Sequence, residues 1–202
     1  MTKNLATLLW IVGFVLSTAA LADFTEGPKK YRVWVDGIYD LAHYGHQKSF
    51  EKARALTAQH FHVDPGQVEV IVGVCGGDIK AYKREPVFSL EQRVSQIQSF
   101  KGVDKVVADA PLLFNESYIE KYQIDLVMHG DDYTEEKIHH YYPGLLEKGI
   151  FKIYPYEPGI SSSYITRRAA QIALETLLQK QDLGCGDKEA VEHVLSLMNP
   201  VS

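Results

Sequence analysis

Two histidines flank a glycine in a segment whose residue types and spacing could bind a phosphate. His43 and His46 lie on either side of Gly45, after a run that alternates apolar and polar residues and before an apolar spacing typical of a helix. Histidine can hold a proton near neutral pH, and a helix N-terminus presents free N–H groups, so this loop suits a developing phosphate charge. Gly45 would let a phosphate approach the backbone without a Cβ in the way. A surface loop with incidental histidines, or half of a metal site, would show the same short pattern.

The elements that must position these histidines alternate between strands and helices. Strands are expected in the first part of the segment that begins at Tyr31, and at residues 68–74, 103–107, 124–128 and 150–154. Helices are expected after the histidine loop to about residue 56, at 89–100, 115–122 and 141–148, and from the 159–163 segment to about 180. Such an alternation predicts an α/β fold with a five-stranded parallel sheet flanked by helices.

Polar side chains follow the predicted strands at the points where those strands end. Asp36 and the two histidines follow the first strand, Lys83 the second, His129 and Asp132 the fourth, and a run of three serines the fifth. Ligands of open α/β sheets bind outside the carboxyl ends of the strands, so these groups are expected to converge.

The composition limits the class of protein. The chain has 202 residues, of which 46% are hydrophobic and 23% charged, and this suits one compact domain with a substantial core. Its net charge is −5, and it has no run of lysine and arginine, so nothing marks it as a nucleic-acid-binding protein. The two cysteines, Cys75 and Cys185, do not form a C-x-x-C pair, which argues against a disulfide framework.

The amino terminus differs from the rest of the chain. Residues 1–22 combine a lysine, a long apolar run and an Ala-Leu-Ala end, which is typical of a signal peptide, although the run is almost long enough to serve as an uncleaved membrane anchor. Either interpretation leaves residues 23–182 as the folded domain and 183–202 as an accessory C-terminal helix. Membrane association is expected only through the N-terminal segment.

Six stretches resemble, in order, the motifs of a known enzyme family. They lie at residues 35–46, 70–74, 86–93, 104–107, 124–132 and 159–163. The family is the cytidylyltransferases that act on choline phosphate, ethanolamine phosphate and glycerol 3-phosphate, within the HxGH nucleotidyltransferase superfamily. The resemblance implies a Rossmann-like sheet and transfer of CMP from CTP to a phosphorylated alcohol, which yields a CDP-alcohol for phospholipid synthesis and pyrophosphate. It also implies Mg²⁺, which would arrive mainly with the triphosphate because the acidic residues offer no obvious protein cage.

The resemblance assigns residues of this sequence to three roles. The catalytic groups would be His43, His46 and Lys83. The nucleotide would be bound by Gly37, Ile38, Tyr39, Gly45, Arg93, Asp131, Asp132, Gly159, Ile160, Ser161, Ser162 and Ser163. The phosphorylated alcohol would be bound by Asp36, Lys83, Leu112, His129 and Tyr142.

Two positions depart from the family pattern. Tyr156 stands where the family has an arginine that meets the CTP phosphates, and Lys152, Arg167 or Arg168 would have to supply the charge. Leu112 replaces the tryptophan that faces the quaternary ammonium in choline-specific members. A carboxylate with fewer aromatic neighbours suits a primary ammonium better than a trimethylated one, so phosphoethanolamine is expected ahead of phosphocholine.

Two other classes of function remain open at this point. One is an adenylyltransferase of the same fold, and the other is a catalytically weak nucleotide-binding protein. We expect a homodimer, and a protein that is exported or membrane-anchored with its catalytic domain in a compartment that contains CTP, on the cytoplasmic side of a membrane or in a host cytosol.

Overall fold

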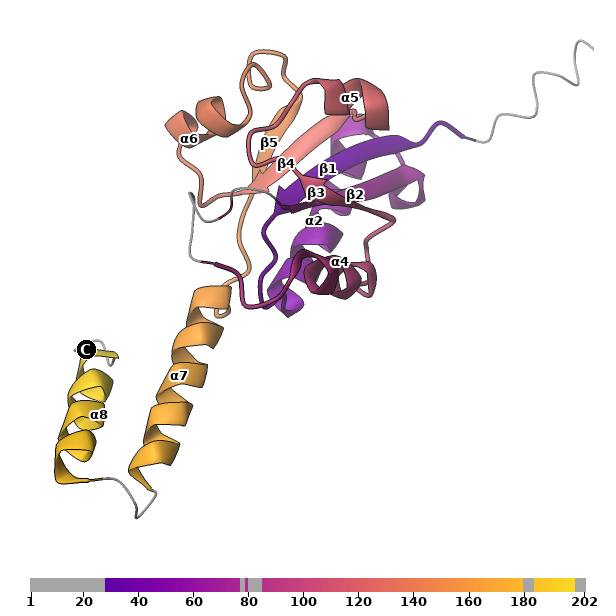
Figure 1. The fold of residues 1–202 in the computed structure, drawn as a ribbon. Helices are drawn as coiled ribbons and strands as arrows, with labels where there is room; N and C mark the ends of the chain where they lie inside the picture. The colour runs from indigo at the N-terminus through magenta and orange to yellow at the C-terminus, as the bar shows by residue number, and fades with distance from the viewer. Residues whose placement is uncertain (1–27, 77–78, 80–84, 180–183, 199–202) are drawn as a thin grey trace, which may run out of the picture.

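A five-stranded parallel sheet forms the centre of the protein. The computed structural model describes residues 28–76, 79, 85–179 and 184–198. The strands are β1 (Tyr31–Gly37), β2 (Val68–Cys75), β3 (Lys105–Ala110), β4 (Leu126–Gly130) and β5 (Phe151–Tyr154). They lie side by side in the order β3-β2-β1-β4-β5, and every pair is parallel (Figure 1). The predicted α/β fold with a Rossmann-like five-stranded parallel sheet is therefore confirmed.

Helices connect the strands and cover both faces of the sheet. They are α2 (Tyr44–Phe61), α4 (Leu90–Gln98), α5 (Ser117–Tyr122), α6 (Glu135–Tyr141), α7 (Ser162–Leu178) and α8 (Cys185–Met198), with a short 3₁₀ turn at Pro65–Gln67. Side chains that accept a hydrogen bond from a first-turn N–H begin four of these helices, namely His43, Ser89, Thr134 and Ser161.

One predicted helix was misplaced. The expected helix at residues 141–148 is wrong, because the helix of this region is α6 and residues 142–149 form turns. Thr134 caps α6, and two glutamates in its first turn suit the helix dipole. Gly144 and Gly149 both have positive φ, which helical backbone does not allow. The apolar spacing that indicated a helix instead reflects Tyr142 and Leu145, which bury their side chains from within the turns.

The core is divided into two layers by the sheet. Alternate residues of β1 point to opposite faces, so that Val33 and Val35 lie in one cluster with α2 and α4, whereas Trp34 lies in the other with α5 and α6. All three side chains are at most 1% exposed. The order in which strands are added changes side at β1, because β2 and β3 lie on one side of it and β4 and β5 on the other. That switch point leaves a crevice at the carboxyl ends of β1 and β4.

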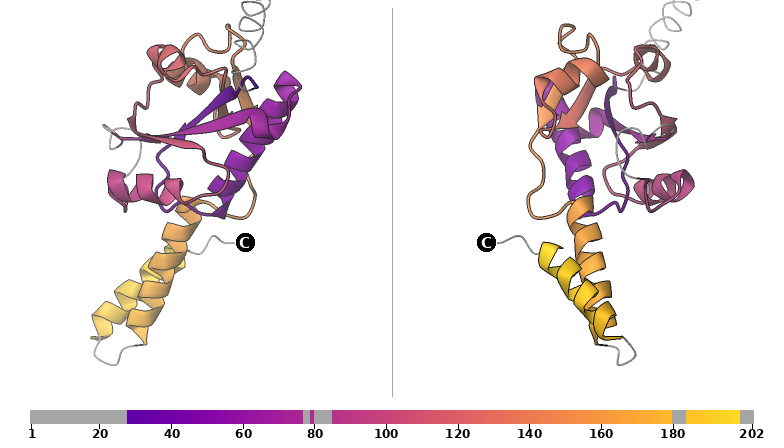
Figure 2. Two further views of the ribbon diagram at one scale, coloured as in Figure 1. Left: turned by 90° about the vertical axis from the view of Figure 1, so that its right-hand side faces the viewer. Right: turned by 60° about the vertical axis from the view of Figure 1, so that its left-hand side comes forward.

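Helices α7 and α8 form a hairpin that projects away from the sheet, as both views in Figure 2 show. The two helices pack against each other, and no residue of α7 is classed as buried. Within the described residues, no helix has both the length and the hydrophobicity needed to span a bilayer. The predicted signal peptide or anchor at 1–22 lies outside the described residues.

Candidate active site

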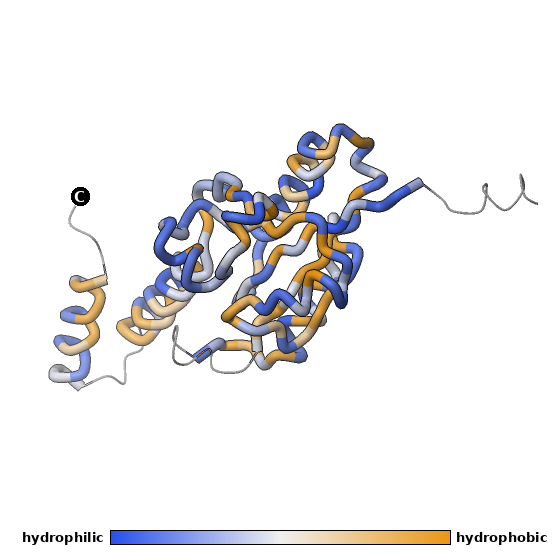
Figure 3. Tube along the Cα trace, turned by 90° about the horizontal axis from the view of Figure 1, so that it is seen from above, coloured by the Kyte–Doolittle hydropathy of each residue, from blue (hydrophilic) through white to orange (hydrophobic). Residues whose placement is uncertain are grey.

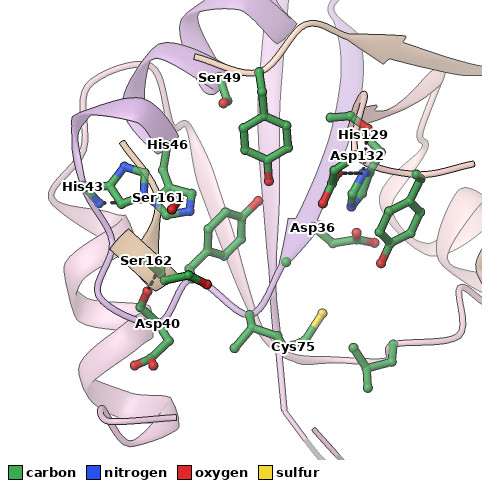
Figure 4. Close-up of a pocket in the computed structure, with 18 of the residues that line it drawn as sticks. Asp36, Asp40, His43, His46, Ser49, Cys75, His129, Asp132, Ser161 and Ser162 are labelled. Atoms are coloured by element: carbon green, nitrogen blue, oxygen red, sulfur yellow. Dashed lines mark hydrogen bonds and ion pairs between the residues drawn. The ribbon is translucent and has the colours of Figure 1, made fainter. Parts of the chain in front are cut away.

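A cavity of about 610 Å³ opens at the carboxyl ends of β1 and β4. It is bounded by the loop after β1, the loop after β4 and the N-terminus of α7, and its volume lies within the range of small-molecule sites. Figure 4 shows His43, His46 and Ser161 on one side of the cavity, and Asp36, His129 and Asp132 on the other. The sequence predicted that the polar groups at the strand ends converge, and the described residues among them do.

The two histidines are held by the start of α2. His43 is the N-cap residue, and its Nδ1 accepts a hydrogen bond from the N–H of Gly45 at 3.2 Å, while His46 Nδ1 accepts from the N–H of His43 at 3.1 Å. Their rings are in contact, tilted by 33° with centroids 4.0 Å apart. Because both Nδ1 atoms are acceptors, each neutral ring carries its proton on Nε2, where it can donate to a ligand.

Burial reinforces this neutral state for His43. Partial burial lowers the pKa of His43 from its ordinary value of 6.5. Protonation would also place a second N–H at Nδ1 and break its bond to Gly45. At pH 7 His43 is therefore a neutral hydrogen-bond donor rather than a fixed positive charge.

Gly45 lies directly beneath the His43 ring. A Cβ at this position would lie 2.9 Å from both Cε1 and Nδ1 of His43 and 3.0 Å from Cγ2 of Ile160. The glycine is therefore needed because the His43 ring and Ile160 pack directly on its Cα. The approach of a phosphate to the backbone at Gly45 stays a prediction.

Tyr39 gives the loop between β1 and α2 its shape. It adopts φ 54°, and Leu41 adopts φ 51°, a left-handed conformation that is uncommon for residues other than glycine. The Tyr39 ring packs over Gly37 and meets the edge of His46 with centroids 5.4 Å apart. Strain of this kind persists only where the surroundings impose it, and it occurs often at functional sites. Tyr39 and Gly37, together with Ile38, line the cavity as predicted.

Asp36 lies on the opposite wall, at the end of β1. One carboxylate oxygen accepts a hydrogen bond from Trp34 Nε1 at 2.8 Å, and the other accepts from the hydroxyl of Tyr142. Burial raises the pKa of Asp36 above its usual value, and the nearby His129 opposes that shift. Two fixed donors thus aim the carboxylate into the cavity, and each oxygen keeps a lone pair for a ligand.

Aromatic side chains surround this carboxylate. His129 stacks on Tyr133 with centroids 3.9 Å apart and lies 5.8 Å from Tyr142, and all three line the cavity together with Leu112. Asp132 Oδ1 lies 3.5 Å from His129 Nδ1. Tyr133 was missed by the sequence reasoning, although its position directly after the His-Gly-Asp-Asp run could have signalled it. The predicted substrate residues Asp36, Leu112, His129 and Tyr142 are therefore brought together.

The third wall is the N-terminus of α7. Ser161 caps this helix by accepting from the N–H of Tyr164 at 3.1 Å, and the hydroxyl of Ser162 donates to the backbone oxygen of Asp40 at 2.6 Å. Ser161, Ser162 and Ser163 all line the cavity. Gly159 and Ile160 do not line it: Gly159 has φ +88° in an exposed turn, and Ile160 supports Gly45 from behind. Their predicted contacts with the nucleotide stay a prediction.

Arg93 joins three segments around the cavity. Its side chain is 3% exposed, and its guanidinium donates to the backbone oxygens of Ile38 at 2.6 Å, Cys75 at 2.8 Å and Phe88 at 3.3 Å. Arg93 is not among the residues that line the cavity. These bonds give it a structural role, and its binding of the nucleotide stays a prediction.

Two aspartates likewise hold loops in place. Asp131 accepts a hydrogen bond from the N–H of Tyr156 at 3.0 Å and is not among the residues that line the cavity, and its contact with the nucleotide stays a prediction. Asp40, which the sequence reasoning missed, accepts from the N–H groups of Val87 at 3.0 Å and Phe88 at 3.2 Å. It therefore fixes the segment before α4 against the loop that carries the histidines.

Positive charge is scarce at the cavity. Its described lining includes Tyr156 but no lysine or arginine. Lys152 Nζ lies 2.9 Å from His60 Nδ1, and neither it nor the exposed Arg167 and Arg168 lines the cavity, so none of the three supplies the charge that Tyr156 lacks. Lys83, the predicted catalytic lysine, lies outside the described residues. No cluster of three or more potential metal-ligating side chains occurs in the described part of the chain.

Comparison with known proteins places this geometry in a family. Residues 34–168 match the family described as Cytidylyltransferase-like. The chain is 38% identical over 109 residues to an ethanolamine-phosphate cytidylyltransferase of Arabidopsis thaliana, with 52% of this chain and 24% of that protein covered. It is 37% identical over 120 residues to the Mus musculus ethanolamine-phosphate cytidylyltransferase, with 57% and 27% covered.

A third relative is matched over more of its length. Choline-phosphate cytidylyltransferase 2 of Arabidopsis thaliana is 28% identical over 173 residues, with 83% of this chain and 54% of that protein covered. The chain thus spans between about a quarter and about half of the length of these three relatives. Because the family match covers the whole cavity from β1 to α7, the chain belongs to the cytidylyltransferase-like family.

Proposed function

We propose that this protein transfers CMP from CTP to a phosphorylated amino alcohol, with phosphoethanolamine ahead of phosphocholine. The observation that supports the proposal is the shared cavity, in which the pair of histidines faces a carboxylate that is held by Trp34 and Tyr142. A phosphomonoester oxygen of the alcohol would attack the α-phosphorus of CTP. The bond from the α-phosphorus to the bridging oxygen would break, so that pyrophosphate leaves and a CDP-alcohol forms.

Most of the rate would come from positioning and from charge stabilisation, because this reaction needs no covalent enzyme intermediate. His43 and His46 would donate from Nε2 to oxygens of the α-phosphate, whose negative charge changes most during transfer. The N-terminus of α7, with Ser161 to Ser163, would bind other phosphate oxygens. Lys83 would add a positive charge, and Mg²⁺ would accompany the triphosphate.

The alcohol end of the substrate would be recognised at Asp36. An ammonium group can take up the free lone pairs of this carboxylate while His129, Tyr133 and Tyr142 enclose it. A primary ammonium has N–H donors for the carboxylate, which a trimethylated ammonium lacks. Leu112 offers no aromatic face to compensate for that loss, and this supports phosphoethanolamine as the better substrate.

The compartment and the pathway follow from this chemistry. CTP must be available where the domain works, so we propose that residues 23–202 act in a CTP-containing compartment even if residues 1–22 direct or anchor the protein to a membrane. The CDP-alcohol product suits phospholipid synthesis.

The test is to measure pyrophosphate release from CTP and Mg²⁺ with phosphoethanolamine, phosphocholine and glycerol 3-phosphate, with ATP replacing CTP as a second arm. Asp36→Asn should raise KM for phosphoethanolamine by about tenfold to a hundredfold, the value of one charge-assisted hydrogen bond, with KM for CTP nearly unchanged. Leu112→Trp should shift preference toward phosphocholine by about tenfold. Asp64→Asn is the matched control, because Asp64 lies just before β2, at the amino ends of the strands and therefore away from the cavity.

Three results would overturn the proposal. The first is the absence of product with all three phosphorylated alcohols, the second is a preference for ATP, and the third is an Asp36→Asn variant that loses CTP binding but keeps its KM for the alcohol. The second of these would indicate an adenylyltransferase of the same fold.

A catalytically weak nucleotide-binding protein is a second candidate, and Tyr156 favours it. The ring of Tyr156 packs over Gly130 at the rim of the cavity, where the family pattern has an arginine. Calorimetry separates the two candidates, because a weak enzyme would bind CTP without releasing pyrophosphate at a measurable rate with any of the three alcohols.

A further inference from the structure

Three buried tyrosines line the cavity, and the hydroxyl of one of them has no partner among the described residues. Tyr39, Tyr142 and Tyr154 are 8%, 3% and 6% exposed. The hydroxyl of Tyr142 donates to Asp36, and that of Tyr154 bonds to the Ser49 side chain. Within the part of the chain that the structure describes, nothing forms a hydrogen bond with the Tyr39 hydroxyl.

The surroundings of Tyr39 make such a hydroxyl unusual. Hydrophobic residues recur through the sheet domain, as Figure 3 shows, and Tyr39 belongs to the buried cluster that includes Val35 and Phe50. A polar group buried in this way normally has a hydrogen-bond partner. Because the small exposed part of Tyr39 faces the cavity, its hydroxyl can find that partner in a ligand.

The Tyr39 hydroxyl lies between the two walls of the cavity. A Cβ added at Gly37 would lie 3.1 Å from Cζ of Tyr39, the carbon that bears the hydroxyl, so this end of the ring lies over the residue directly after Asp36. The same ring meets His46 edge-on, with centroids 5.4 Å apart. His46 and Asp36 lie on opposite sides of the cavity in Figure 4. A ligand group bound between these two residues would therefore meet the hydroxyl.

The chemistry of this hydroxyl suits an anion. Burial raises the pKa of Tyr39 well above its ordinary value of 10, and the neighbouring Tyr154 and Asp36 add to that shift. The hydroxyl therefore keeps its proton near neutral pH and can donate it in a hydrogen bond. Phosphate oxygens accept such bonds, and the described lining of the cavity contains no lysine or arginine that would satisfy them.

We propose that the Tyr39 hydroxyl binds the phosphate of the phosphorylated alcohol, the group that attacks CTP; this inference rests on the proposed function. In phosphoethanolamine, two carbon atoms separate the phosphate from the ammonium. With the ammonium at Asp36 and the α-phosphate of CTP at His43 and His46, the attacking phosphate must lie between them, beside the Tyr39 hydroxyl. The hydroxyl would donate to an oxygen that does not attack, and so orient the one that does.

Tyr39→Phe in the full-length chain tests this role, because it removes the hydroxyl and retains the ring that packs on Gly37 and His46. KM for the alcohol should rise by about tenfold to a hundredfold, the value of one hydrogen bond to a charged group. KM for CTP and kcat should change by less than about threefold, because the bond is present both before and during transfer. Tyr31→Phe is the matched control, because Tyr31 lies at the amino end of the same strand, away from the cavity.

The choice of alcohol separates this role from that of Asp36. The rise in KM for Tyr39→Phe should be similar for phosphoethanolamine, phosphocholine and glycerol 3-phosphate, because all three carry the phosphate. Asp36→Asn should instead affect the two alcohols that carry an ammonium. A rise for Tyr39→Phe that is confined to those two would place the hydroxyl at the ammonium and overturn the inference.

Thermal unfolding separates ligand binding from a structural role. Tyr39→Phe should leave Tm unchanged, whereas Tyr154→Phe should lower it, because the Tyr154 hydroxyl has a protein partner. An unchanged KM for all three alcohols would overturn the inference whatever the Tm, and a raised KM for CTP alone would assign the hydroxyl to the nucleotide. Both results come from an active wild-type protein and leave the proposed function intact. A wild-type protein that makes no product with any alcohol would instead overturn the proposed function, and this inference with it.

Discussion

Replacing Gly45 by alanine tests whether the His43 ring must lie directly on the backbone of α2. An alanine Cβ would lie 2.9 Å from two atoms of that ring and 3.0 Å from Ile160, so the ring or the isoleucine must move. Such overpacking costs about 1–3 kcal/mol, and loss of the His43 cap costs roughly 0.5–2 kcal/mol. The usual gain for glycine to alanine within a helix, about 0.5–1 kcal/mol, opposes these costs but is smaller.

The net expectation for Gly45→Ala is a loss of about 1–3 kcal/mol, which corresponds to a Tm lower by roughly 3–10 °C for a chain of this size. Displacement of the ring should also lower kcat by about a hundredfold, the cost of losing one oriented donor. Differential scanning calorimetry and pyrophosphate release measure the two effects.

Gly186→Ala is the matched control, because Gly186 lies in the first turn of α8 and a Cβ there meets nothing within 4 Å. It should raise Tm slightly and leave kcat unchanged. A Gly45→Ala protein with unchanged or raised Tm and normal kcat would show that His43 is not held against Gly45, and the account of the histidine pair would be wrong.

Three further predictions address the surroundings of the cavity. Arg93→Leu should lower Tm by about 5–10 °C, because it leaves one buried and two partly buried carbonyl groups without this donor, whereas a raised KM for CTP with normal Tm would indicate a nucleotide ligand instead. Tyr156→Arg should lower KM for CTP by about tenfold by adding a charge at the cavity rim, and an unchanged KM would show that this rim does not meet the phosphates. Because the pKa of His43 is lowered in the folded protein, its contribution to folding stability should be constant above about pH 6.5, the unfolded-state value, and fall as the pH drops below it. Activity should fall only at a lower pH, where the folded His43 becomes protonated; activity that rises on acidification would show that the imidazolium is the working form.

The sheet and the groups at its edge could be predicted because they depend on local patterns. Alternating or continuous apolar runs mark the strands, and polar residues at strand ends must converge at one edge of a parallel sheet. The helix at residues 141–148 was wrong because buried turns can have the same apolar spacing as a helix. Thr134, which is followed by two glutamates, was the cap signal that would have placed α6 correctly.

The roles of Arg93, Asp131 and Asp40 could not be predicted, because each depends on backbone groups from distant segments. Arg93 donates to carbonyl oxygens of the loop after β1, the end of β2 and the segment before α4, and no periodicity in the sequence shows that these three segments meet. The packing that requires glycine at position 45 could not be predicted either, because Ile160, which packs against Gly45, lies far from it in the sequence. The sequence could place a charged residue near the cavity, but only the tertiary structure shows which backbone groups its side chain bonds to.

Hydrogen bonds at the cavity join parts of the chain that the ribosome synthesises at very different times. Tyr142 reaches Asp36 across 106 residues, and Ser162 reaches the Asp40 backbone across 122. A nascent chain can pair β1 with β2, and β2 with β3, early, but the opposite flank of β1 must wait for β4 to emerge from the ribosome. Until then that flank of the central strand exposes unpaired N–H and C=O groups to other chains, so co-translational protection of β1 is most needed between the synthesis of β3 and that of β4.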